Sequence, residues 1–167
     1  MRVLGVDPGS NATGFGVVEK IGNKLTLMAD GTIRQARGQA LSLRLKIIYD
    51  ELTRTIEETR PEEVAVESLF FARNPQSALK LGHARGVALL AAVNAGLPVF
   101  EYSPLEVKKA VVGYGRAGKE QVQMMVGTLL NSRKKRSRDA ADALAIAVCH
   151  LLSSRSPLAG YRTDGRV

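Results

Sequence analysis

The chain has 167 residues, 45% of them hydrophobic, and no repeat at solenoid period, which predicts one compact globular domain. No run approaches the roughly 18 apolar residues of a membrane span, and the N-terminus enters a strand rather than a signal peptide, so we expect a cytoplasmic protein with no membrane partner. Lys and Arg number 24 against 16 Asp and Glu, and the net charge of +8 is typical of a protein that binds a polyanion, although ordinary basic proteins share it.

The N-terminal part of the sequence predicts three strands followed by a helix. The strands are predicted by apolar, β-prone segments at residues 1–7, 14–20 and 24–33. The Gly22-Asn23 pair between the last two marks a hairpin turn. Residues 39–59 carry apolar side chains at helical spacing, at Leu41, Leu45, Ile48, Leu52 and Ile56. Pro61 ends this predicted helix.

The rest of the sequence alternates between helix and strand. Residues 62–68 predict a strand, a helix begins at Asn74 and Pro75 and runs to about residue 94, and residues 97–103 predict a fifth strand. Two or three further helices extend to about residue 153. A meander of three strands followed by this alternation predicts an α/β domain with a mixed five-stranded sheet flanked by helices, over residues 1–152. Residues 153–167 are polar with Gly and Pro, which predicts a disordered C-terminal tail.

Two carboxylates end predicted strands. Asp7 ends the first strand, where Pro8 and Gly9 stop it, and Glu67 ends the fourth. Alternation along that fourth strand places Glu67 on the face opposite to that of Val66. A carboxylate at the end of a buried strand needs a partner, and the carboxyl ends of strands are where open α/β sheets form their sites.

Asp139 and Asp142 are three residues apart near the start of a predicted helix, and therefore share one face of it. Two isolated acids there would ordinarily interact with the helix dipole. Four carboxylates in one crevice would repel one another unless a multivalent cation neutralised them. All-oxygen ligands favour Mg²⁺, and a pair of ions roughly 3.5–4 Å apart would activate a water and stabilise the leaving oxygen in phosphodiester hydrolysis.

Four separated blocks of sequence resemble, in order and spacing, the RuvC family of bacterial Holliday-junction resolvases. They are VDPGSNATGFGVVE, VESLFFARNPQSALKLGHARGVAL, VKKAVVGYGRAGKEQVQMMV and RDAADALAIAVCH. The resemblance covers residues 1–152 and implies an RNase H-like fold, a homodimer, and resolution of four-way DNA junctions by paired symmetric nicks. It also implies cooperation with the branch-migration proteins RuvA and RuvB. By this resemblance the catalytic and metal-binding set is Asp7, Glu67, Asp139 and Asp142, with divalent metal. Together with the ligand chemistry above, we expect two Mg²⁺ ions per active site, for which Mn²⁺ can substitute.

Two neighbouring aromatic residues are candidates for contact with the DNA crossover. Phe70 and Phe71 follow Glu67 in a loop expected at the mouth of the crevice. Most aromatic residues belong to a core, but a ring beside the metal site can wedge against a base. Phe70 matches the aromatic position that the RuvC family uses in junction binding, and we prefer it to Phe71 on that ground.

Basic residues follow in two groups. Lys108, Lys109, Arg116 and Lys119 surround a glycine-rich loop, and the run RKKRSR, residues 133–138, precedes Asp139. Such runs usually form a solvated face, but beside a metal site they are expected to track phosphates. Lys108 and Lys119 match family positions that support DNA binding and catalysis.

Several other patterns have weaker or purely structural interpretations. The segment GYGRAGKE, residues 113–120, resembles a Walker A motif up to its lysine but has Glu120 where Ser or Thr is required. Gly82 and Gly86 allow close packing of their helix, on the sheet or, by family resemblance, in a dimer interface. We interpret His83, His150 and Cys149 as structural residues. Glu101 also ends a strand, without a catalytic counterpart in the family.

Three alternative functions remain open at this stage. The turn after the first strand also resembles the phosphate-binding turn of actin-like and sugar-kinase ATPases, which need two lobes where this chain supplies one. A basic nucleic-acid-binding module without catalysis would share the charge but not depend on Asp7 or Glu67. An RNase H-like nuclease that acts on another branched substrate would share the carboxylates, because these specify the chemistry and not the shape of the DNA.

Overall fold

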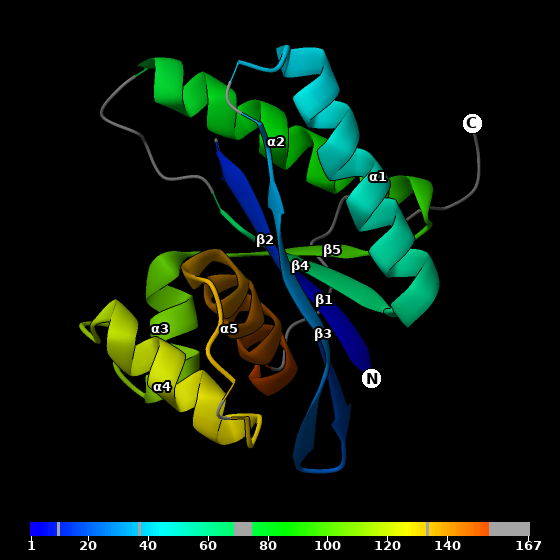
Figure 1. Ribbon diagram of the computed structural model, residues 1–167. Helices are drawn as coiled ribbons and strands as arrows, with labels where there is room; N and C mark the ends of the chain where they lie inside the picture. Colours follow the sequence, from blue (N-terminus) through cyan, green and yellow to red (C-terminus); the bar gives the residue numbers. More distant parts are fainter. Residues whose placement is uncertain (10, 37, 69–74, 133, 154–167) are drawn as a thin grey trace.

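The computed structural model describes residues 1–9, 11–36, 38–68, 75–132 and 134–153. Its centre is a five-stranded sheet in the order β3-β2-β1-β4-β5 (Figure 1). The strands are β1 (Arg2–Asp7), β2 (Ala12–Ile21), β3 (Lys24–Arg34), β4 (Glu63–Glu67) and β5 (Val99–Tyr102). The first three pair antiparallel, whereas β4 and β5 continue the sheet in parallel from β1. The predicted α/β fold with a mixed five-stranded sheet is confirmed.

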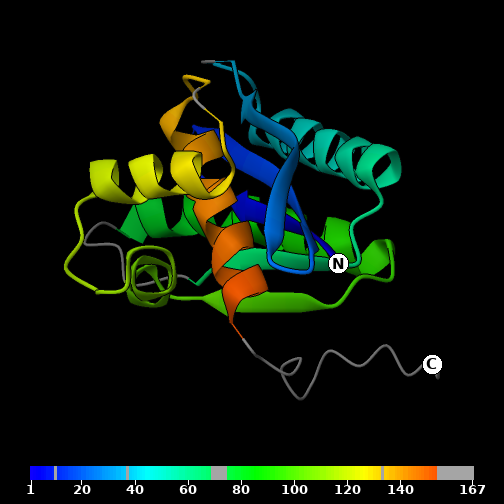
Figure 2. The same cartoon turned by 90° about the horizontal axis from the view of Figure 1, so that it is seen from below.

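Helices cover both faces of the sheet. They are α1 (Leu41–Thr59), α2 (Pro75–Asn94), α3 (Pro104–Val112), α4 (Lys119–Leu129) and α5 (Arg138–Leu152). Figure 1 shows α1 and α2 on one face and α3, α4 and α5 on the other, and Figure 2 shows α5 running across the strands. Each predicted strand and helix is present, with ends shifted by a few residues. The predicted tail lies outside the described residues from residue 154 onward.

Strand alternation divides the hydrophobic core into two layers. Val3 of β1, Val18 of β2 and Ala65 of β4 pack with α5 in one layer. The other layer lies beneath α1 and α2. It contains the strand residues that point to the opposite face, such as Val6 of β1 and Val66 of β4. Burial of apolar surface on both faces stabilises the sheet. Because side chains alternate along a strand, it also determines the face to which the last side chain of each strand points.

Glycines allow α5 to lie directly on β1 and β2. A β-carbon on Gly14 would overlap the carbonyl oxygen of Asp139, and one on Gly5 would overlap that of Ala143. Gly16 occupies the same face, where a β-carbon would come within 2.6 Å of the Leu144 side chain. Glycine inside a strand marks such a close approach of another backbone. The helix that carries two of the candidate acids is therefore seated closely on the sheet.

Of the three residues interpreted as structural, His150 and Cys149 are buried, whereas His83 is not. His150 is buried, with Nδ1 2.7 Å from Tyr102 Oη and Nε2 2.5 Å from Glu63 Oε2. Cys149 of α5 is fully buried in the core layer that this helix forms with the sheet. His83 lies on an exposed position of α2.

Among the described residues, no helix is both long enough and apolar enough to cross a membrane.

Candidate active site

Asp7 and Glu67 lie at the carboxyl ends of neighbouring parallel strands. β1 and β4 pair up to Val6 and Val66, and each acid is the next residue of its strand. Alternation places Asp7 on the face of Val3 and Glu67 on the face of Ala65, and both of these residues pack toward α5. The two carboxylates therefore point to the same side of the sheet, at the edge where the sequence predicts a site.

The first turns of α5 bring Asp139 and Asp142 to the same place. Ser137 caps this helix, and its hydroxyl accepts a hydrogen bond from the backbone N–H of Ala140. The Asp139 backbone lies against Gly14 of β2, and Gly14 is the residue paired with Asp7 in the β1–β2 ladder. The four predicted acids thus converge from β1, β4 and α5.

The proton affinities of the strand acids reflect this convergence. The pKa of Asp7 is raised from 3.8 to about 7, first by burial and then by the charges of Glu67, Asp142 and Asp139. The pKa of Glu67 is also raised, by burial and by the charge of Asp142. These shifts place the charges of Glu67, Asp139 and Asp142 close enough to Asp7, and that of Asp142 close enough to Glu67, to disfavour ionisation of the two strand acids. Such an arrangement is a common property of functional sites.

Lys119 supplies the compensating positive charge. It is the first residue of α4, and its Nζ lies 3.3 Å from Asp142 Oδ2. The pKa of Lys119 is raised, chiefly by the charge of Asp142, while its own charge lowers the pKa values of Asp7 and Glu67. The ammonium therefore belongs to the carboxylate cluster, although 77% of this side chain is exposed.

A cavity of about 70 Å³ opens beside the cluster. Its polar lining consists of Glu67, Asp142, Lys108 and Lys119, and its apolar lining comes from α3, α4 and α5. Of the other predicted DNA-binding residues, Lys109 is exposed on α3 and Arg116 is exposed in the connection to α4, and neither lines this cavity. Phe70 and Phe71 lie outside the described residues.

The donor set fits a hard divalent cation. All four acids offer oxygen ligands, which Mg²⁺ and Mn²⁺ prefer. Burial and then the charges of the neighbouring acids raise the pKa of Asp7, and a divalent cation bound there would favour its ionised form. Within the described ranges no three acidic, His or Cys side chains already surround a single point as ligands would, and Asp142 is paired with Lys119.

Sequence reasoning missed two features that build the site. One is the set of strand glycines on which α5 packs, Gly5, Gly14 and Gly16. Glycine inside a predicted strand was the available signal, since it indicates where another backbone comes close. The other is the ion pair between Asp30 of β3 and Arg136, which anchors the segment before α5. Glu101 lies on the opposite face and pairs with Arg85 of α2 at 2.5 Å, so it does not join the cluster.

Comparisons with known proteins agree with this geometry. The family model described as Crossover junction endodeoxyribonuclease RuvC matches residues 3–150. Relatives of that name from Geobacter sulfurreducens and Syntrophotalea carbinolica are 57% and 58% identical, over 92% and 90% of this chain and 94% and 93% of theirs. The structure of T. thermophilus RuvC in complex with a Holliday junction substrate superposes with a TM-score of 0.86 at 39% identity, over 91% of this chain and 93% of that one. The chain therefore belongs to the RuvC family of crossover junction endodeoxyribonucleases.

Proposed function

We propose that this chain is a structure-selective endonuclease that resolves four-way DNA junctions by paired, symmetric nicks, in DNA recombination and repair. The observation that carries the proposal is the convergence of Asp7, Glu67, Asp139 and Asp142 at one end of the sheet, next to the ammonium of Lys119. A relative of the same family has been solved with a Holliday junction substrate over nearly the same length of chain. The substrate we assign is accordingly four-way junction DNA.

The four acids would hold divalent metal, and we assign Mg²⁺, two ions per site, with Mn²⁺ able to substitute. Bound metal would supply activation of a water molecule and stabilisation of the charge that develops on the scissile phosphate. The protein's own contribution is to fix the ligands on three rigid elements, β1, β4 and α5, so that little reorganisation is needed when metal and DNA bind. The close packing of α5 on Gly14 holds the Asp139 backbone near Asp7, because Gly14 is the strand partner of Asp7.

The basic residues around the cluster have distinct proposed roles. Lys119, whose Nζ lies 3.3 Å from Asp142 Oδ2, would contribute positive charge near the scissile phosphate, and Asp142 would be one of the residues that hold metal. Lys108, on the wall of the same cavity, contacts a neighbouring phosphate. Lys109 and Arg116 are exposed nearby and extend the positive surface toward the DNA. By family resemblance Phe70, or else Phe71, wedges against a base at the crossover.

The proposed homodimer would place two active sites against two equivalent strands of the junction. Support comes from α2, where the side chains of Leu79 and Leu90 are 65% and 51% exposed. These leucines, together with Gly82 and Gly86, fall on one face of the helix by its 3.6-residue period. Such a face suits close packing against a second copy. Cooperation with RuvA and RuvB, in the cytoplasm, is proposed from the family resemblance.

The decisive experiment compares cleavage of a labelled four-way junction with cleavage of a linear duplex of matched sequence. Intact protein and Asp7→Asn are each tested with Mg²⁺ and with EDTA. We expect metal-dependent paired nicks in opposing strands of the junction, none in the duplex, and loss of cutting but not of binding in the variant. Tight junction binding without any metal-dependent cutting would leave a binding module, while equal cutting of the duplex would mean a nuclease with another substrate.

A further inference from the structure

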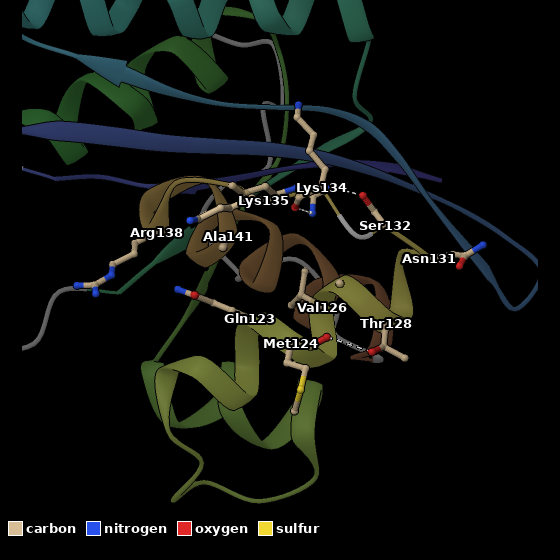
Figure 3. Close-up of a pocket in the computed structure, with 12 residues that line it drawn as sticks. Gln123, Met124, Val126, Thr128, Asn131, Ser132, Lys134, Lys135, Arg138 and Ala141 are labelled. Carbon is tan, nitrogen blue, oxygen red and sulfur yellow. Dashed lines mark hydrogen bonds between the residues drawn. The ribbon is translucent and has the colours of Figure 1, made fainter.

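A second hollow, larger than the one beside the carboxylates, lies between α4 and the segment that leads into α5. It has a volume of about 690 Å³. We call it the basic groove, and it is lined by Gln123, Met124, Val126, Gly127, Thr128, Asn131, Ser132, Lys134, Lys135, Arg136, Arg138 and Ala141. Figure 3 shows α4 side chains on one side of the groove and the basic side chains of the segment on the other. Among the lining residues that the structure describes, four are cations and none is a carboxylate.

A buried ion pair anchors the basic residues that precede α5. The side chains of Arg136 and Asp30 are only 7% and 9% exposed, and Arg136 Nε lies 3.3 Å from Asp30 Oδ2. Arg136 also donates hydrogen bonds to Ser132 Oγ and to the carbonyl oxygen of Lys134. Lys134 Nζ lies 3.6 Å from the other oxygen of Asp30. Because breaking a buried pair leaves an uncompensated charge, this anchor holds residues 134–136 against β3.

Two cations of the groove remain available for a ligand. Lys135 and Arg138 are exposed, and neither makes an ion pair with any residue that the structure describes. The surrounding side chains of Gln123, Thr128 and Asn131 are hydrogen-bonding groups. A pair of exposed cations among polar side chains suits phosphate oxygens.

Residues from the same part of α5 line both the basic groove and the cavity beside the carboxylate cluster. Arg138 and Ala141 line the groove, whereas Asp142 lines the cavity beside the cluster. Arg138 and Asp139 are consecutive residues at the start of α5, with Cα atoms about 3.8 Å apart, so the groove begins beside the first acid of that helix. Helix α4 links the two hollows as well, with Lys119 and Val122 at the cavity and Gln123 at the groove.

We propose that the basic groove binds the sugar-phosphate backbone of a duplex arm of the DNA substrate, without reading its base sequence. This deepens the proposed function and rests on it, since it assigns a second contact region to the same substrate. DNA is favoured over an acidic protein because the groove adjoins the carboxylate cluster and its lining is mainly polar, with Met124 and Val126 as its larger apolar side chains. Protein interfaces have a more apolar centre.

The test is a salt titration of DNA binding in EDTA, with a four-way junction and with a linear duplex. The groove variant is Lys135→Gln/Arg138→Gln. The matched control, Lys24→Gln/Arg60→Gln, removes the same charge from two exposed residues at the opposite end of the sheet. Each phosphate contact adds about 0.9 to the slope of log affinity against log salt. We expect the groove variant to lose up to about 1.8 of that slope and roughly tenfold in affinity for both DNAs.

An equal slope and affinity in the groove variant and the control would overturn the proposal. Unchanged DNA binding together with lost binding of a poly-glutamate peptide would overturn it in favour of an acidic protein partner. Failure of the proposed function is distinguishable, since it would be seen as absent junction cutting by the intact protein, whereas the salt titration measures binding alone.

Discussion

Gly14 of β2 and Asp139 of α5 are in backbone contact, with no room between them for a β-carbon. Gly14 is also the ladder partner of Asp7. One glycine therefore sets the spacing between two acids that are 132 positions apart in the sequence. The position of Asp139 depends on packing of α5 against β2, rather than on any residue adjacent to it in the chain.

Gly14→Ala should therefore damage the site more than the fold. The new methyl group would push the first turn of α5 away from β2, and overpacking of this kind costs about 1–3 kcal/mol of stability. We expect junction cleavage to fall by about 100-fold or more, since small misplacements at a reacting centre are costly, while junction binding is retained. The control is Gly16→Ala, whose β-carbon meets the Leu144 side chain instead. Equal losses of cleavage in both variants, at equal stability, would contradict this account.

The elements of the fold could be predicted because each carries a local signal. Apolar, β-prone runs bounded by Pro and Gly indicated the strands, and apolar residues three and four positions apart indicated α1. Asp7 and Glu67 could be placed at one edge of the sheet because both end strands that run in parallel. That reasoning needs only strand order and direction, which the α/β pattern supplies.

The remaining parts of the site depend on contacts that no local pattern encodes. The approach of Lys119 to Asp142 joins two different helices. The pairing of Asp30 with Arg136 joins β3 to the segment before α5. Spacing put Asp139 and Asp142 on one helical face but did not say which strand that face would meet. The strand glycines held that information, since they mark where a backbone must approach.

Asp7 should make the stability of the metal-free protein depend on pH. Its pKa is raised from 3.8 to about 7 in the folded state, so the folded protein binds more protons than the unfolded chain between these values, and stability falls as pH rises from about 4 to 7. Asp7→Asn removes this penalty. In EDTA we expect the variant to be more stable than the parent at pH 8, on the order of a few kcal/mol, with the difference vanishing near pH 4.

Urea denaturation in EDTA at several pH values would measure this difference. Adding Mg²⁺ at pH 8 should raise the stability of the parent and have much less effect on Asp7→Asn, because a ligand that binds only the folded state stabilises it. A parent that is at least as stable as the variant at pH 8 in EDTA would show that the burial of Asp7 carries no such penalty.

Lys119→Gln should shift the pH dependence of cleavage. The charge of Lys119 lowers the pKa values of Asp7 and Glu67, so its removal raises both, and the acids must reach a higher pH before they are ionised. We expect the acidic limb of the rate profile to move to higher pH, with a lower rate at pH 7. Lys109→Gln, on an exposed part of α3 outside the cavity, is the control. A lower rate with an unmoved acidic limb would assign Lys119 to phosphate contact alone.

Tyr102→Phe should destabilise the fold through a buried hydrogen bond. Tyr102 is 1% exposed, and its hydroxyl lies 2.7 Å from His150 Nδ1, whose other ring nitrogen faces Glu63. Removing the hydroxyl leaves that buried nitrogen without this partner, at a cost of about 1–3 kcal/mol. Tyr49→Phe is the control, since its hydroxyl accepts a hydrogen bond from Asn94 in an exposed setting and its loss should cost less than about 0.5 kcal/mol. Urea denaturation of both variants measures the difference, and equal free energies of unfolding would mean that the buried hydroxyl contributes no more to stability than the exposed one.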